Sequence, residues 1–113
     1  SGHARRPMAL IGVYAATKAA IDQMSQSMAF ELALYGITVN QLWPGFVDTN
    51  INDPKPELAT DEGRKKLLAT IPIGQPATIE ELGAAAVYLA GNHGAVVTGD
   101  FIKIDGGQHI RCI

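Results

Sequence analysis

The segment YAATKAAIDQMSQSMAFELALYG, Tyr14–Gly36, sets the first element of the fold. It is rich in Ala, Met, Gln, Glu and Leu, which are strong helix formers, so the sequence predicts a helix from about Leu10 to Tyr35. Gly36 follows at the position where a left-handed residue commonly ends a helix. The apolar residues that recur at helical spacing form one stripe along this helix: Ile21, Met24, Met28 and Leu32.

Two strands and two shorter helices are predicted after this first helix. The β-branched residues in Ile37–Trp43 indicate a short strand, and Pro44-Gly45 ends it. Residues 57–70 can form a short amphipathic helix, after a polar stretch without a regular period. A second strand is expected over Phe101–Ile104, closed by the turn Asp105-Gly106-Gly107.

The helix expected over residues 79–91 has its own start signal. Thr78 and Glu81 match a capping box, in which the hydroxyl and the carboxylate satisfy each other's backbone N–H groups. Its residues expected to point inward are Leu82, Ala86 and Leu89.

The order of elements indicates an α/β fold. Helix, strand, loop, two helices and a second strand favour a parallel sheet with right-handed connections. Two strands alone do not make an independently stable sheet, and parallel strands are normally covered on both faces. The sequence therefore resembles half of a domain more than a whole one.

Composition excludes several classes of function. The chain has 113 residues, a hydrophobic content of 47% and a net charge of −2, which indicate one globular domain and give no electrostatic basis for nucleic-acid binding. We expect no membrane span, because no apolar run approaches about 20 residues. The single cysteine, Cys112, favours a cytoplasmic setting. We expect no metal site, because the histidines lack ligand spacing.

Tyr14 and Lys18 are the candidate catalytic pair. Residues four apart share a helix face, so both side chains can reach one volume. A phenol has a reference pKa of about 10, and a nearby ammonium group lowers it, which would let Tyr14 act as a general acid or base. The alternative is that Tyr14 packs and Lys18 is a solvated surface charge, since this spacing is common in helices.

Four motifs in order make the sequence resemble the C-terminal half of a short-chain dehydrogenase/reductase. They are Tyr-x-x-x-Lys at the start of the long helix, an Asn followed by Pro-Gly and a Thr, a Pro-x-Gly turn before a helix, and a closing Asp-Gly-Gly. The matching residues are Tyr14 and Lys18; Asn40, Pro44, Gly45 and Thr49; Pro72 and Gly74; and Asp105, Gly106 and Gly107. The resemblance implies one unit over residues 1–113, the C-terminal half of a Rossmann-like parallel sheet with flanking helices.

The resemblance also implies roles for single residues. Tyr14 would exchange a proton with an alcohol or ketone substrate while NAD or NADP carries the hydride, and Lys18 would lower the pKa of Tyr14 and bind the nicotinamide ribose. The nicotinamide pocket would be lined by Pro44, Gly45, Val47 and Thr49. Ser1, thirteen residues before Tyr14, would be the catalytic serine, and a serine just before the chain begins is the alternative.

Two functions remain open at this point. The glycines form no dinucleotide-binding motif, so the cofactor-binding N-terminal half of the family's domain is expected to be missing here. The first possibility is a segment of an active NAD(P)-dependent oxidoreductase. The second is a truncated, non-catalytic fragment that acts only as an oligomerisation or interaction module. In either case the resemblance implies a homo-oligomer that assembles through helices 10–35 and 79–91.

Overall fold

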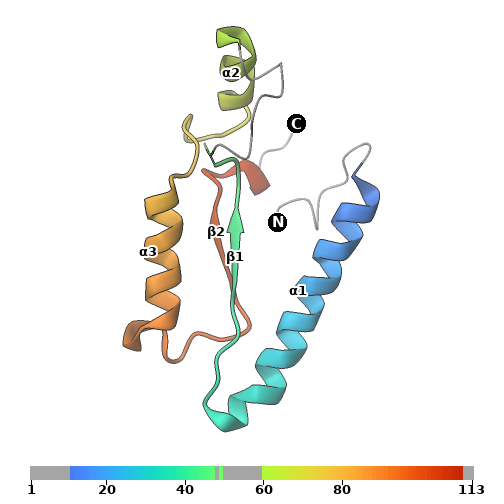
Figure 1. Ribbon diagram of the computed structural model, residues 1–113, viewed down its shortest axis with the longest axis vertical. Helices are drawn as coiled ribbons and strands as arrows, with labels where there is room; N and C mark the ends of the chain where they lie inside the picture. The colour runs from blue at the N-terminus through green and yellow to red at the C-terminus, as the bar shows by residue number, and fades with distance from the viewer. Residues whose placement is uncertain (1–10, 48, 50–59, 111–113) are drawn as a thin grey trace.

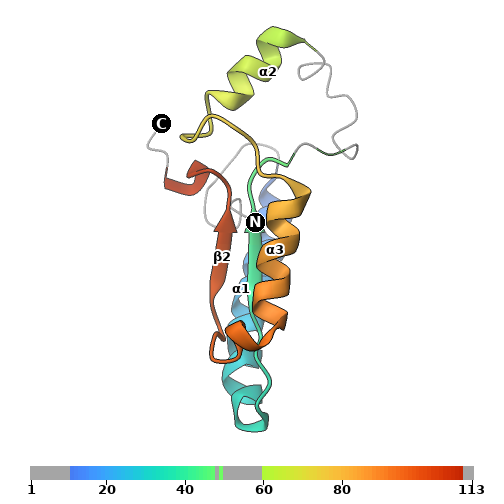
Figure 2. The same ribbon diagram turned by 90° about the vertical axis from the view of Figure 1, so that its left-hand side faces the viewer.

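The computed structural model describes residues 11–47, 49 and 60–110. Its elements, in chain order, are α1 (Gly12–Leu32), η2 (Ala33–Tyr35), β1 (Gln41–Pro44), α2 (Asp61–Leu68), α3 (Ile79–Ala90), η4 (Asn92–Gly94), β2 (Phe101–Ile104) and η5 (Gln108–Ile110). The two strands form a parallel sheet, with α1 over one face and α3 over the other (Figures 1 and 2). The predicted α/β fold and its order of elements are confirmed.

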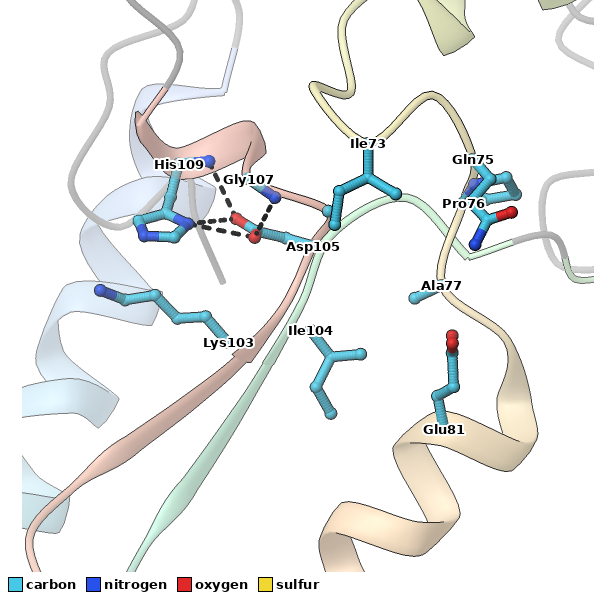
Figure 3. A pocket seen from close by; sticks show the side chains of 11 residues that line it. Ile73, Gln75, Pro76, Ala77, Glu81, Lys103, Ile104, Asp105, Gly107 and His109 are labelled. Atoms are coloured by element: carbon cyan, nitrogen blue, oxygen red, sulfur yellow. Dashed lines mark hydrogen bonds and ion pairs between the residues drawn. The ribbon is translucent and has the colours of Figure 1, made fainter.

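The two faces of the sheet differ in chemistry. Strand β1 pairs with β2 in the register Gln41↔Phe101 through Pro44↔Ile104. Gln41 faces α1, since its Nε2 donates to the main-chain oxygen of Asp22 at 3.2 Å. Side chains alternate along a strand, so Trp43 and Lys103 face α1 as well, and Ile104 points toward α3 (Figure 3).

Strand β1 begins later than the sequence predicts. The strand was expected over Ile37–Trp43, but it runs from Gln41 to Pro44. Asn40 explains the delay, because its side chain occupies the position where a strand ladder would start: Nδ2 donates to the Val97 oxygen at 2.6 Å and Oδ1 accepts from the Asp100 N–H at 3.2 Å. Asn40 therefore ties two loops together.

Caps define the helix ends as the sequence indicates. The Thr78 hydroxyl accepts from the Glu81 N–H at 3.1 Å, and a Glu81 carboxylate oxygen accepts from the Thr78 N–H at 2.8 Å, so the predicted capping box is confirmed. The Thr60 hydroxyl caps α2 through the Gly63 N–H at 3.1 Å. Gly36 adopts the expected left-handed conformation, with φ 70°, after the short η2 turn.

Three of the four residues of the apolar stripe on α1 are exposed, and the fourth, Leu32, is half-buried. Ile21, Met24 and Met28 are 42%, 55% and 40% exposed, whereas Asp22 and Ala29 are buried. The face of α1 toward the sheet is thus made of small and polar residues, and the apolar stripe lies open. In α3 the expected inward residues Leu82 and Leu89 are half-buried, but Ala86 is exposed and Ala85 takes its place.

The small core centres on Trp43. Its side chain is 3% exposed and meets Phe101 edge-on, with ring centroids 4.9 Å apart, and Lys103 places Nζ 5.6 Å from the Trp43 ring centroid. Such edge contacts add about 0.5–1.5 kcal/mol to the area that the rings bury. Trp43 is therefore a packing residue in this structure. None of the helices in the described ranges is both long and apolar enough to cross a membrane.

Candidate active site

Tyr14 and Lys18 lie together near the start of α1. The Lys18 Nζ is 5.5 Å from the centroid of the Tyr14 ring, the range of a cation–π contact. Tyr14 is 46% exposed and Lys18 is half-buried, so the phenol is open to a reactant while the ammonium group lies beside it. Helix geometry produces this pairing, because residues four apart stack along one face.

The loop that follows β1 is held rigidly from two sides. The Gly45 N–H donates to the Ile104 oxygen at 3.0 Å, and the Phe46 N–H donates to Gln108 Oε1 at 3.1 Å. On the other side, the Ala77 N–H donates to the Phe46 oxygen at 3.0 Å, and Val47 forms a parallel bridge with Ala77. Residues 45–47 therefore have a fixed position at the carboxyl end of β1.

Only glycine fits at position 45. A Cβ atom there would lie 2.6 Å from Asp105 Cβ and 2.7 Å from Asp105 Cα, far inside carbon–carbon contact distance. The Pro44-Gly45 motif is thus required by the close approach of the β1 and β2 ends.

Asp105 organises the turn after β2. Its carboxylate accepts the Gly107 N–H at 3.0 Å and the His109 N–H at 2.9 Å, and lies 2.8 Å from His109 Nδ1. Burial works to raise the pKa of Asp105, but the hydrogen bonds from Gly107 and His109 outweigh it and hold that pKa below its usual value. Asp105 therefore stays ionised at neutral pH and stabilises the turn through three donors.

A cavity of about 340 Å³ lies beside this turn, between the end of β2 and the start of α3 (Figure 3). It is lined by Ile73, Gln75, Pro76, Ala77, Glu81, Lys103, Ile104, Asp105, Gly106, Gly107 and His109. Neither Tyr14 nor Lys18 belongs to this lining. The cavity is therefore separate from the candidate catalytic pair. Within the described ranges, no group of three or more His, Cys, Asp or Glu side chains could hold a metal ion.

The structure brings some of the predicted site residues together and leaves others apart. Tyr14 and Lys18 are in contact, and Pro44, Gly45 and Val47 share one braced loop. The first half of α1 lies toward the same end of the molecule as the carboxyl end of β1 (Figure 1). Thr49 is half-buried just beyond the loop. Ser1 lies outside the described residues.

Sequence reasoning missed three residues that shape this region. Gln108 bonds to the loop after β1 and, through Nε2, to the Thr70 hydroxyl at 3.0 Å. His109 pairs with Asp105 at a spacing of four, a signal the sequence does contain. Asp22 is buried in α1, which no periodicity indicated.

Comparison with known proteins identifies the family. The model of the enoyl-(acyl carrier protein) reductase family, a group of short-chain dehydrogenases/reductases, matches residues 1–109. The chain belongs to the short-chain dehydrogenase/reductase family. The resemblance inferred from the four sequence motifs is thereby confirmed.

Curated members of this family with similar sequences are oxidoreductases. The chain is 34% identical over 97 residues to the 3-oxoacyl-[acyl-carrier-protein] reductase FabG of Salmonella typhimurium, an alignment covering 86% of the chain and 38% of FabG. It is 37% identical over 98 residues to the L-rhamnose 1-dehydrogenase (NAD(P)(+)) of a Sphingomonas species, covering 87% of the chain and 38% of that enzyme. The chain thus spans about two fifths of the length of these relatives.

Solved structures of short-chain dehydrogenases/reductases share the fold. A gluconate 5-dehydrogenase from Burkholderia cenocepacia, in complex with NADP and tartrate, superposes with a TM-score of 0.87 at 29% identity, over 99% of this chain and 43% of that one. RhlG of Pseudomonas aeruginosa, in an NADP active-site complex, gives a TM-score of 0.85 at 34% identity, over 96% of this chain and 42% of that one. The expected Rossmann-like architecture is confirmed.

Proposed function

We propose that these residues are the catalytic part of an NAD(P)-dependent oxidoreductase that interconverts a carbonyl and an alcohol. The observation that carries the proposal is the position of the Lys18 ammonium, 5.5 Å from the ring of a half-exposed Tyr14. In a member of the short-chain dehydrogenase/reductase family, that pair is best explained as a general acid/base.

Each residue of the pair has a defined task. The Tyr14 hydroxyl donates a proton to the carbonyl oxygen during reduction and accepts it back during oxidation. The Lys18 ammonium favours the phenolate form of Tyr14, because an adjacent positive charge stabilises a developing negative one. A nicotinamide cofactor, when bound, would provide the hydride chemistry that complements this proton transfer.

The loop after β1 suits the binding of that cofactor. Ligands of open α/β sheets bind beyond the carboxyl ends of the strands, and residues 45–47 lie there in a fixed position. Pro44, Gly45, Val47 and Thr49 would line the nicotinamide pocket, and Lys18 would also bind the ribose. Relatives named for NAD(P)(+) or solved with NADP support NAD or NADP as the cofactor.

Related enzymes support a small alcohol or ketone as the substrate. The activities for which these relatives are named include the reduction of a 3-oxoacyl group and the oxidation of sugars or sugar acids, which all interconvert a carbonyl and a hydroxyl. A cytoplasmic location stays a prediction from the single cysteine.

Replacing Tyr14 by phenylalanine tests the proposal. Tyr14→Phe removes only the hydroxyl. In the full-length natural protein that carries these residues, we expect kcat with NAD(P)H and a panel of ketones to fall about 10²–10⁴-fold. Tyr35→Phe is the matched control, since Tyr35 is 77% exposed in η2, and should keep its activity. Retained turnover in Tyr14→Phe would refute the role of Tyr14.

Two further variants separate the tasks of the other residues. Lys18→Met should move the pH profile of the oxidative direction to higher pH and raise KM for the cofactor. Thr49→Ala should raise KM for the cofactor more than KM for the substrate. An unchanged pH profile in Lys18→Met would argue against electrostatic support of Tyr14.

We also propose that the protein forms a homo-oligomer through α1 and α3. The open stripe of Ile21, Met24 and Met28 supports this, as does Val87 of α3, which is 73% exposed, because contiguous exposed apolar faces mark interaction sites. Met24→Glu should lower the mass measured by light scattering, while Glu31→Gln should not. An assembly that forms while turnover is absent would favour the non-catalytic oligomerisation module instead.

A further inference from the structure

Helix α1 continues the line of Tyr14 and Lys18 with a third polar residue. Asp22 lies four residues after Lys18, so Tyr14, Lys18 and Asp22 occupy successive turns of one face. At Asp22 the helix lies against the sheet, since Gln41 of β1 donates to the Asp22 main-chain oxygen. The apolar periodicity of the helix does not predict a buried aspartate at this position.

The Asp22 carboxylate is buried, but the described residues do not satisfy all of its hydrogen-bonding capacity. Asp22 is 7% exposed, and its Oδ2 atom has no hydrogen-bond partner among the described residues. Gln41 does not supply one, since its Nε2 donates to the Asp22 main-chain oxygen and its Oε1 accepts from Trp43 Nε1 at 3.4 Å. Burying a charged oxygen without a partner is costly, so a donor for Oδ2 is to be expected.

Among the described residues, the charged groups on α1, β1 and β2 leave Lys18 as the cation best placed to reach Asp22. Strand β1 has no charged side chain among Gln41–Pro44. On β2, Lys103 holds its Nζ over the Trp43 ring, and beyond it Asp105 and His109 pair with each other. Lys18 lies on the same helix face, one turn away, at the spacing that brings a lysine and a carboxylate into reach.

We propose that Asp22 is a positioning residue for Lys18. The unpartnered Oδ2 of Asp22 attracts the Lys18 ammonium toward the sheet-facing side of α1. This attraction competes with that of the Tyr14 ring. Lys18 then has two positions, one beside the phenol of Tyr14 and one beside the carboxylate of Asp22. The mechanistic part of this inference rests on the proposed function, whereas the proposed approach of the Lys18 ammonium to the Asp22 carboxylate does not.

The pH dependence of lysine acylation tests the contact directly. The complete protein is treated with trace acetyl-N-hydroxysuccinimide over a range of pH, and mass spectrometry measures the labelling rate of each lysine. In Asp22→Asn we expect the pH of half-maximal labelling of Lys18 to fall, because a nearby opposite charge favours the ammonium form. At pH values below that midpoint, labelling of Lys18 should rise up to about tenfold.

Three controls make the result specific. Lys65, exposed on α2, should label identically in all variants. Glu31→Gln removes an equal charge from the exposed side of α1 and should leave Lys18 unchanged, while Asp22→Glu, which keeps the carboxylate, should restore the wild-type midpoint. Asp22→Ser replaces Asp22→Asn if that variant does not fold.

Two outcomes would overturn the inference. The first is an unchanged midpoint for Lys18 when the Asp22 carboxylate is removed. The second is an equal rise in labelling at every pH, which indicates greater exposure rather than a lost charge. Acylation needs no turnover, so the two proposals can fail separately. A shifted labelling midpoint of Lys18 together with full activity in Tyr14→Phe would refute the proposed function and still support the inferred pairing of Lys18 with Asp22.

Discussion

Gly45→Ala should destabilise the protein by about 2–3 kcal/mol. The added Cβ would lie 2.6 Å and 2.7 Å from Asp105 Cβ and Cα, whereas carbon atoms in contact are about 3.5 Å apart or more. Neither atom of Asp105 can rotate away, so the loop must shift by nearly 1 Å. Such overpacking costs about 1–3 kcal/mol, and the shift also weakens the bonds from Gly45 to Ile104 and from Phe46 to Gln108, each worth about 0.5–1.5 kcal/mol.

Urea unfolding at equilibrium, followed by circular dichroism, measures this cost. Gly83→Ala is the matched control, because a Cβ at Gly83 would meet nothing within 4 Å among the described residues. Gly83 lies inside α3, where alanine is favoured over glycine by about 0.5–1 kcal/mol, so this variant should be more stable than the wild type. Replacing glycine by alanine should thus lower the free energy of unfolding at position 45 and raise it at position 83. A Gly45→Ala variant within about 0.5 kcal/mol of the wild type would refute the steric argument.

The remaining predictions concern the turn after β2, the start of α3 and the core. Because the pKa of Asp105 is lowered, its ionised form stabilises the folded state above about pH 4. Asp105→Asn should therefore cost about 1–3 kcal/mol at pH 7, and the difference from wild type should shrink as the pH falls through the lowered pKa of Asp105; a difference that stays constant as the pH falls would contradict this. Thr78→Ala should cost about 1 kcal/mol by removing a cap, seen as a lower urea midpoint, whereas Ser25→Ala, whose hydroxyl bonds within α1, should change it little. Trp43→Ala should cost about 3–5 kcal/mol in the same assay, and a loss below 1 kcal/mol would show that Trp43 is not central to the core.

The sequence predicts the elements of this fold well where local chemistry decides them. The capping box at Thr78 and Glu81, the left-handed Gly36 and the strand Phe101–Ile104 all depend on a few neighbouring residues. The start of β1 was placed too early, because the amide of Asn40 bonds to residues 57 and 60 positions away. No local pattern contains that information.

The candidate site was predictable only in part, for a related reason. The pairing of Tyr14 with Lys18 follows from helix spacing, so the sequence reveals it directly. The bracing of the loop by Gln108 and the burial of Asp22 arise from tertiary contacts. The open apolar stripe on α1 shows the same limit, since periodicity locates a stripe without saying what covers it.

The pairing of β1 with β2 joins residues about sixty positions apart, and α2 and α3 lie between the two strands in the chain. Lengthening such a connection is inexpensive, since doubling a flexible loop costs only about 0.6 kcal/mol of closure entropy. The anchors at its two ends, Asn40 with Asp100 and Gly45 with Ile104, do not depend on its length. The segment between the strands can therefore differ in length between homologues while the pairing of β1 with β2 stays the same.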